Sequence, residues 1–206
     1  MNARATSTRM AARRPLRADA VATRQRVIDA ALALARTCSI DTLTMRDIAA
    51  KAGVSAATAY TYFASKQHVY AEAYLAGVYT LTERLRSRPP RGATAADRVA
   101  SVFRRAVEGA ASTGDVVQAT AIALASSDPS VSVIRPRIDE AFDEWMTIAL
   151  AGARINDRAA TQKVLQLAMF AAFVAVAHGR FTMGEVGELL DLTVRRMVVE
   201  TADVPT

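Results

Sequence analysis

The side chains that most often carry catalysis are few in this sequence. It contains one cysteine, Cys38, and two histidines, His68 and His178, and none of the three lies in a known catalytic motif. The P-loop, the dinucleotide-binding glycine pattern, the HExxH zinc motif and the GxSxG nucleophile elbow are all missing. One cysteine also excludes an intrachain disulfide and a cysteine-based zinc cluster. We therefore expect no catalytic residue, no metal site and no cofactor, and a helical enzyme is the less favoured alternative.

Side chains that bind a polyanion are instead concentrated in the first third of the chain. Residues 1–66 contain eleven Lys and Arg against four Asp and Glu, whereas residues 67–206 contain fifteen against sixteen. The whole excess of the net charge of +6 therefore lies near the N-terminus. A general bias toward Arg and Ala would explain the residue types but not their segregation. Because a local field steers a polyanion, we predict an N-terminal unit that binds one.

Two short helices joined by a tight turn are predicted over residues 44–63. Thr44 can cap the first helix, with Asp47 three positions later as in a variant capping box, and Gly53 can end it in a left-handed conformation. Ser55 can cap the second helix. The apolar positions of the first helix recur at steps of three and four residues: Met45, Ile48, Ala49 and Ala52. This is the arrangement of a helix-turn-helix, whose second helix lies in the major groove of DNA.

The second of these helices carries hydroxyl groups and small side chains, which suit DNA. Hydroxyl groups can donate to phosphates or base edges, and Ala and the Thr methyl group can meet a thymine methyl group. Lys66 and the helix N-termini supply positive ends for phosphates. An ordinary helical hairpin with two tyrosines over a core has the same spacing, so spacing alone leaves both interpretations open.

The segment TMRDIAAKAGVSAATAYTYFASK closely resembles the DNA-binding signature of the TetR family, and TRQRVIDAALALA upstream is similar to that family's first helix. The resemblance covers about residues 20–75. It departs from the family pattern at Ser39 and Ala57, where glycine is frequent, and at Ala59, where leucine is usual, so base preference cannot be carried over. The residues that carry it are Thr44, Asp47, Ile48, Ala49, Ala52, Gly53, Val54, Ser55, Thr58, Tyr60, Phe63, Ser65 and Lys66.

The resemblance implies a set of DNA contacts and a dimer. It implies that Thr44, Tyr60 and Lys66 contact phosphates. The residues that it places nearest the groove are Arg46, Ser55, Ala56, Ala57, Thr61 and Tyr62, and Thr58 completes the predicted DNA-binding set. We expect the partner to be double-stranded DNA, with a palindromic operator that a homodimer reads.

The whole chain is predicted to be all-α: an N-terminal three-helix helix-turn-helix domain joined to a larger C-terminal helical bundle (about nine helices). Residues 1–18 are predicted to be a disordered basic arm, residues 19–80 the DNA-binding domain and residues 81–206 a regulatory domain for ligand binding and dimerisation. Pro136 should kink or split one helix. Besides the helix-turn-helix, helices are predicted over residues 20–37, 66–86, 94–112, 115–126, 129–151, 157–178 and 183–201.

The last two predicted helices are the candidate dimer interface. The segment LQLAMFAAFVAVAHG is apolar on more than one face, as in a helix that packs against its own subunit and a partner. With the final helix it could form a four-helix interface, and a monomeric core is the alternative. The nearly uncharged run 164–177 is shorter than the roughly 20 residues of a membrane span. With no signal peptide in the sequence, we expect a cytoplasmic protein and no membrane partner.

A small-molecule effector, apolar or amphipathic, is predicted to bind among the middle helices. Gln118 is the candidate polar contact. The large, mostly apolar candidates are Phe103, Val107, Ile122, Phe142, Trp145, Met146, Met169 and Phe173. Each of these could equally be an ordinary core residue. The sequence thus predicts a sequence-specific DNA-binding regulator, a repressor that the ligand releases from its operator. The alternatives are a DNA-binding regulator without a small-molecule effector and, less favoured, a helical enzyme.

Overall fold

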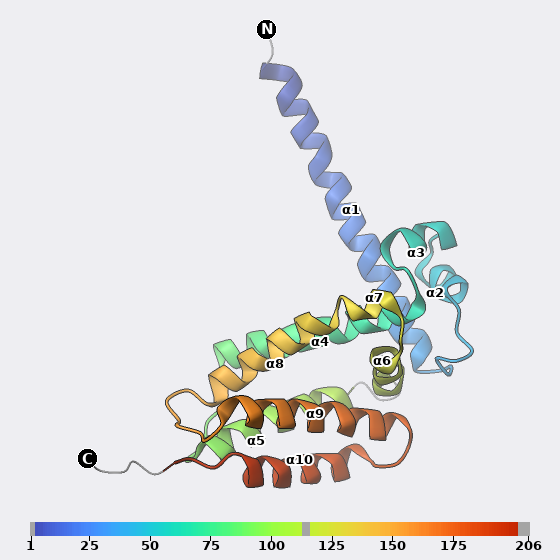
Figure 1. Cartoon of the computed structure of the whole chain (residues 1–206). Helices are drawn as coiled ribbons and strands as arrows, with labels where there is room; N and C mark the ends of the chain where they lie inside the picture. The colour runs from blue at the N-terminus through green and yellow to red at the C-terminus, as the bar shows by residue number, and fades with distance from the viewer. Residues whose placement is uncertain (1–2, 113–115, 202–206) are drawn as a thin grey trace.

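The structure, a computed structural model, describes residues 3–112 and 116–201, and side chains from residue 18 onward. Over these residues the chain is helical, and its one β contact is a single-residue bridge between Ile155 and Glu200. The prediction of an all-α fold is confirmed (Figure 1). The helices are α1 (Ala3–Ala35), α2 (Met45–Ala52), α3 (Ala56–Tyr62), α4 (Lys66–Ser87), α5 (Ala95–Ala111), α6 (Val116–Ala125), α7 (Pro129–Ser132), α8 (Arg135–Ala149), α9 (Arg158–Ala177) and α10 (Met183–Met197).

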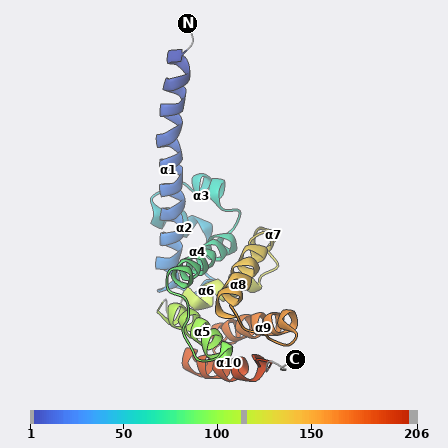
Figure 2. The same ribbon diagram turned by 90° about the vertical axis from the view of Figure 1, so that its left-hand side faces the viewer.

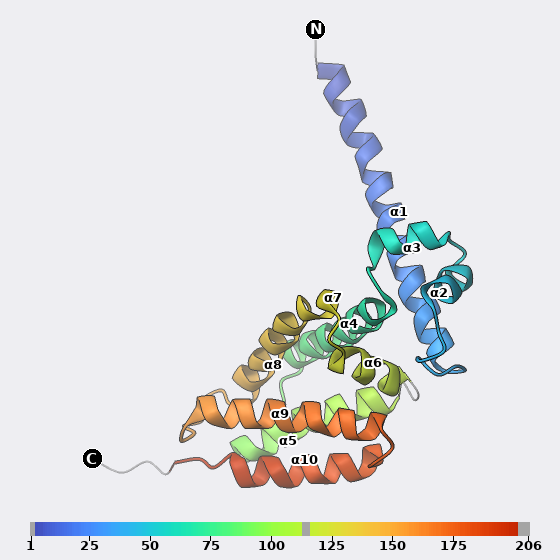
Figure 3. The ribbon, with the colours of Figure 1, turned by 45° about the vertical axis from the view of Figure 1, so that its right-hand side comes forward.

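The first three helices form a head that lies at one end of a larger body (Figures 1 and 3). Helices α2 and α3 pack against the C-terminal half of α1, and the start of α4 closes the group. Their shared core is made of buried apolar side chains, among them Val27, Ala31, Ile48, Ala59 and Phe63. Three residues of α6 belong to the same cluster: Val116, Ala119 and Ala123. The head therefore rests directly on a helix of the body.

The body consists of α4 to α10. Helices α5, α9 and α10 lie together at the end away from the head, and α4 and α8 lie between them and the head (Figure 2). One large apolar cluster fills the body and includes Leu85, Phe103, Trp145, Leu165 and Leu190. Helix α4 contributes to the cores of both the head and the body, so it joins the two mechanically.

Prolines divide the predicted helix 129–151 in two. Helix α7 begins with Pro129, capped by Asp128, and α8 has Pro136 in its first turn. Proline is tolerated in the first turn because the backbone N–H groups there have no partner within the helix. The predicted split at Pro136 is confirmed, and residues 133–134 form the junction.

The N-terminal arm differs from the expectation. Residues 1–18 were predicted to have no regular structure, but α1 begins at Ala3 and continues without a break to Ala35. Alanine and arginine are among the best helix formers, and the downstream part of α1 supplies the nucleus that an isolated segment would lack. Extension of an existing helix is much easier than nucleation, which the prediction from composition did not include. Residues 1 and 2 lie outside the described part.

Helix α9 is longer than the apolar run used to judge membrane spans in the sequence. It begins at Arg158, six residues before that run, and by length and composition alone it could cross a membrane. In the fold it packs against α6, α8 and α10. Only 22% of the apolar 18-residue stretch of α9 is buried, so one apolar face of α9 remains uncovered in the single chain.

Candidate DNA-binding surface and effector site

The start of α2 is fixed by a capping box. The Thr44 hydroxyl accepts the Asp47 backbone N–H at 3.2 Å, and the Asp47 carboxylate accepts the Thr44 backbone N–H at 2.8 Å. The Thr44 hydroxyl also donates to this carboxylate at 2.6 Å. These hydrogen bonds to the charged form lower the pKa of Asp47. The predicted cap is confirmed, and Asp47 is engaged within the helix rather than free to contact DNA.

The turn between α2 and α3 depends on one glycine. Gly53 has φ 68° and ψ 36°, and its N–H reaches the carbonyls of Ala49 and Ala50. A side chain at this position would strain the backbone, since the left-handed region is costly for residues with a Cβ atom. Ser55 then caps α3 by accepting the Thr58 N–H at 3.0 Å. The two helices of the predicted helix-turn-helix are therefore held at a defined angle by local hydrogen bonds.

Helix α3 has one buried and one exposed face. Ala59 and Phe63 are fully buried in the head core, whereas Ala57, Tyr60 and Thr61 are exposed. The remaining predicted contacts on α3, Ala56, Thr58 and Tyr62, are half-buried. Ser55 at its start, and Thr44 and Arg46 at the start of α2, are exposed. Ala57, Tyr60 and Thr61 thus form the outward stripe of α3, and α3 itself lies on the side of the head away from the body (Figure 3).

Most hydroxyl groups of this region are already used inside the head. Ser55 Oγ and Thr58 Oγ1 are 2.8 Å apart, and Thr61 Oγ1 donates to the carbonyl of Ala57 at 3.0 Å. Tyr60, which is 55% exposed, presents its phenol to solvent. Of the predicted phosphate contacts, Tyr60 is therefore the one whose hydroxyl is available without breaking a hydrogen bond of the head.

The Lys66 ammonium group contacts backbone carbonyls of the head, whereas the resemblance implied a contact with a DNA phosphate. This group donates to the carbonyls of Ile40, Asp41 and Leu43 at 2.7, 3.3 and 2.8 Å. An ammonium group has three donors, and all three are directed at the loop between α1 and α2. In this arrangement Lys66 holds the loop against the start of α4, and no donor remains for a phosphate.

Sequence reasoning missed a polar network that joins the head to the body. The Glu72 carboxylate on α4 pairs with Arg24 of α1 at 2.6 Å and with Arg137 of α8 at 3.5 Å. The Arg24 guanidinium also lies 5.1 Å from the ring centroid of Phe63, the residue that ends α3. His68 lies 3.9 Å from Glu72, and burial lowers the pKa of His68 despite that carboxylate. No local pattern could have revealed the contacts of Arg24 and Arg137 with Glu72, because they join helices far apart in sequence.

The predicted effector residues are mostly packed against one another. Phe103 and Phe142 have ring centroids 6.0 Å apart, and Phe142 and Trp145 6.1 Å. The Trp145 indole donates to the buried Thr82 hydroxyl at 2.7 Å. Seven of the nine lie in the body core: Phe103, Val107, Phe142, Trp145, Met146, Met169 and Phe173. Ile122 is half-buried against the head core. In this conformation the predicted aromatic residues pack against one another and occupy the space in which a ligand was expected.

Gln118 lies at a hollow in the body surface. The hollow has a volume of about 450 Å³ between α5, α6, α9 and the start of α10, and Gln118 donates to the Ala177 carbonyl there at 3.1 Å. Its other lining residues are Ala111, Val117, Val176, Ala177, Gly179 and Met183. Val117 also belongs to the body core, so the hollow adjoins that core.

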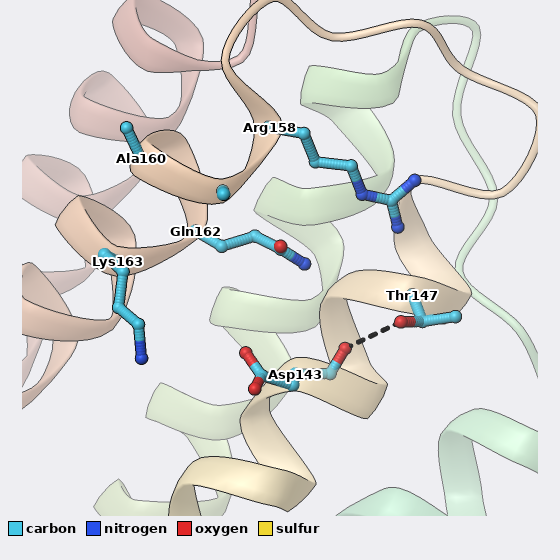
Figure 4. A pocket seen from close by; sticks show the side chains of 7 residues that line it. Asp143, Thr147, Arg158, Ala160, Gln162 and Lys163 are labelled. Carbon is cyan, nitrogen blue, oxygen red and sulfur yellow. Dashed lines mark hydrogen bonds between the residues drawn. The ribbon is translucent and has the colours of Figure 1, made fainter.

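A second hollow, of about 580 Å³, lies between α8 and α9. Figure 4 shows its polar lining, with Arg158, Gln162 and Lys163 of α9 opposite Asp143 and Thr147 of α8. None of the predicted effector residues lines it. Within the described residues, no group of three or more His, Cys, Asp or Glu side chains is placed to hold a metal ion.

Comparison with known proteins agrees with this geometry. Residues 27–73 match the family described as bacterial regulatory proteins, tetR family. The chain is 35% identical over 178 residues to the uncharacterized HTH-type transcriptional regulator Rv0767c of Mycobacterium tuberculosis, covering 84% of this chain and 79% of that protein. It is 25% identical over 176 residues to the HTH-type transcriptional repressor KstR of Rhodococcus jostii, covering 85% and 82%.

Solved structures share the fold over most of the chain. A TetR transcriptional regulator from Rhodococcus sp. RHA1 has a TM-score of 0.70 at 22% identity, covering 85% of this chain and 94% of that one. The repressor FadR of Thermus thermophilus, in complex with lauroyl-CoA, has a TM-score of 0.64 at 24% identity, covering 89% and 99%. With the match over residues 27–73 and the 35% identical relative, the chain belongs to the TetR family of bacterial DNA-binding transcriptional regulators.

Proposed function

We propose that the protein is a dimeric repressor that reads a palindromic operator with α3 and leaves it when a small amphipathic molecule binds the body. The observation that carries the DNA part is the outward stripe of α3, with Ala57, Tyr60 and Thr61 exposed on a helix fixed by the Ser55 cap and the buried Phe63. A short, rigid helix with one solvent-facing side is what major-groove reading requires.

Selection of bound duplexes from a random-sequence DNA pool tests this proposal. We expect enrichment of a motif with two inverted half-sites, whose centres lie about one helical turn, roughly 34 Å, apart. Binding should weaken steeply as salt rises, because cationic groups displace counterions from phosphates. If no motif is enriched from the pool, sequence-specific DNA binding by this chain is wrong.

The uncovered faces of α9 and α10 support the dimer. Large apolar side chains are exposed there on both helices: Val164, Leu167, Phe170, Leu189 and Leu192. Such a patch on a soluble domain marks an interaction surface, and two copies related by a two-fold axis would cover it with a four-helix interface. Sedimentation of the full chain tests this: a monomer at micromolar concentration would contradict the dimer.

The hollow beside Gln118 is our candidate effector site. Its volume of about 450 Å³ lies within the range of small-molecule sites, and it combines apolar walls with the Gln118 amide. The presence of lauroyl-CoA in the similar structure of FadR from Thermus thermophilus supports an amphipathic acyl thioester as the first compound to test. An effector whose apolar part reached past Val117 would have to displace the packed aromatic residues of the core, and so would repack the body.

Titration with lauroyl-CoA, with Trp145 fluorescence and operator release as readouts, tests the effector site. We expect a change in Trp145 emission and weaker DNA binding, both reduced in Gln118→Leu. Gln162→Leu, in the polar hollow between α8 and α9, is the matched control and should respond like the unchanged protein. DNA release that does not depend on Gln118 would mean that the effector binds at another site. No response to any acyl thioester would favour a regulator without an effector.

A further inference from the structure

The orientation of one exposed threonine suggests what α3 reads. Thr61 Oγ1 donates to the Ala57 carbonyl one turn earlier in α3, at 3.0 Å. With the hydroxyl turned back to its own helix, the methyl group is the part of this exposed side chain left for contact with a ligand. The carbonyl that accepts this hydrogen bond belongs to Ala57, whose own methyl group is also exposed, one turn away on the same face.

The outward stripe of α3 therefore offers the methyl groups of Ala57 and Thr61 side by side. The hydroxyls of Ser55 and Thr58 are 2.8 Å apart and share one hydrogen bond, and the Ser55 hydroxyl also accepts the Thr58 N–H. In the major groove only one base carries an apolar group at its edge, the 5-methyl group of thymine. A methyl-bearing patch on a groove-reading helix is complementary to that group and to no hydrogen-bonding base edge.

We propose that Thr61, with Ala57 beside it, reads the 5-methyl group of a thymine in each operator half-site, and that the Thr61 hydroxyl plays no part in base recognition. This inference rests on the proposed function, since it needs α3 in the major groove. It assigns a chemical identity, a thymine methyl group, to one position of an operator whose sequence is otherwise open.

Two substitutions of Thr61 separate its methyl group from its hydroxyl. Thr61→Val keeps the methyl group and removes the hydroxyl, whereas Thr61→Ser does the reverse. We expect Thr61→Val to bind the selected operator within about twofold of the unchanged protein, and Thr61→Ser to lose about fourfold, the value for one buried methyl group. If Thr61 used its hydroxyl on a base, Thr61→Val would lose affinity for the operator and Thr61→Ser would retain it.

The same changes at Thr80 provide the control. Thr80 is exposed on α4 and its hydroxyl donates to the Ala76 carbonyl at 2.9 Å, the geometry of Thr61 away from α3. Thr80→Val and Thr80→Ser should leave operator binding unchanged. An equal loss in the Thr80 variants would mean that the effect comes from helix stability and not from DNA contact.

The DNA is changed in parallel. In the duplex selected from the random pool, each thymine is replaced singly by deoxyuridine, which lacks only the 5-methyl group. We expect one position per half-site to lose about fourfold with the unchanged protein and nothing with Thr61→Ser. An enriched motif with no thymine sensitive to this exchange overturns the inference and leaves the proposed function intact. Failure to enrich any motif overturns the proposed function itself, so the two failures are distinguishable.

Discussion

The ammonium group of Lys66 shows how one residue type can serve two roles that sequence cannot separate. A lysine at the start of a helix next to a helix-turn-helix suits a phosphate contact. In the structure the same group donates to three carbonyls of the loop between α1 and α2. Two of those carbonyls belong to the buried residues Ile40 and Leu43, so their loss of a partner would be costly.

Lys66→Met separates these roles. Methionine keeps the apolar stem but leaves the loop carbonyls without their donor, so we expect the free energy of unfolding to fall by about 2 kcal/mol in urea denaturation. Lys51→Met, at an exposed position on α2, is the control and should unfold like the unchanged protein. A variant at Lys66 with unchanged stability but uniformly weaker DNA binding would instead support the phosphate contact.

Tyr60 is the predicted phosphate contact whose hydroxyl is free to act. Tyr60→Phe should weaken binding to all duplexes by about fivefold, the worth of roughly 1 kcal/mol for one hydrogen bond, without changing the preferred motif. Tyr74→Phe is the matched control, because Tyr74 lies on α4, half-buried against the body core and outside the predicted DNA-binding set. The measurement is DNA affinity for the selected operator and for an unrelated duplex. A changed motif in the Tyr60 variant would mean that the phenol reads a base.

Helices and their ends could be predicted from local sequence, because local hydrogen bonds fix them. The Thr44 cap, the Gly53 stop, the Ser55 cap and the split at Pro136 all depend on residues within four positions of each other. Contacts between elements could not be predicted in this way. The pairing of Arg24 with Glu72 and the packing of α6 under the head depend on the three-dimensional arrangement of helices, which periodicity does not specify.

The capping box of α2 predicts a pH dependence of head stability. The hydrogen bonds to Thr44 lower the pKa of Asp47 below its ordinary value of 3.8 in the folded chain. The contribution of the ionised Asp47 carboxylate to the free energy of unfolding is thus fully present above pH 3.8. It is lost as the pH falls through the lower pKa of the folded chain. Asp47→Asn should be less stable than the unchanged protein at pH 7, and the difference in urea midpoint should shrink in acid. A difference that stays constant with pH would mean that the carboxylate charge has no role.

The Glu72 network predicts that α1 and α8 are energetically coupled through α4. Arg24 and Arg137 share one carboxylate, so removal of either changes the field at the other. In a double-mutant cycle with Arg24→Met and Arg137→Met, we expect a coupling energy above about 0.5 kcal/mol in unfolding free energy. The pair Arg26→Met and Arg137→Met is the control and should be additive, since Arg26 bonds only Thr23 of its own helix among the described contacts. Additivity in both cycles would argue against the network as a link between head and body.

At the scale of the whole molecule, the head and the body are one mechanical unit rather than two units on a linker. The predicted domain boundary lies between residues 80 and 81, but α4 spans this point and belongs to both cores, and α6 supplies part of the head core. The ligand that we propose would therefore act on the position of α3 through packed helices. The hollow beside Gln118 could not be predicted as the candidate effector site, because the large apolar residues singled out in the sequence pack together in this conformation.

In the dimer that we propose, the interface between the copies determines whether two α3 helices can reach an operator together. Leu167 is 66% exposed in the single chain and lies on the apolar face of α9. A glutamate there would place two charges in the proposed interface, one from each copy, where a buried leucine is worth about 1.5–3 kcal/mol and an unpaired carboxylate is unfavourable. We therefore expect Leu167→Glu to weaken dimerisation at least about hundredfold, measured by sedimentation. Its DNA affinity should fall to that of one half-site, since a monomer gains nothing from the second.

Val133→Glu is the matched control for this change. Val133 is 69% exposed at the junction of α7 and α8, away from α9 and α10, so the same charge there removes a similar apolar surface without touching the proposed interface. It should remain dimeric and bind the full operator. If Leu167→Glu also remains dimeric, the copies associate through another face. If it becomes monomeric but protects both half-sites with full affinity, the spacing of the half-sites is not set by α9 and α10.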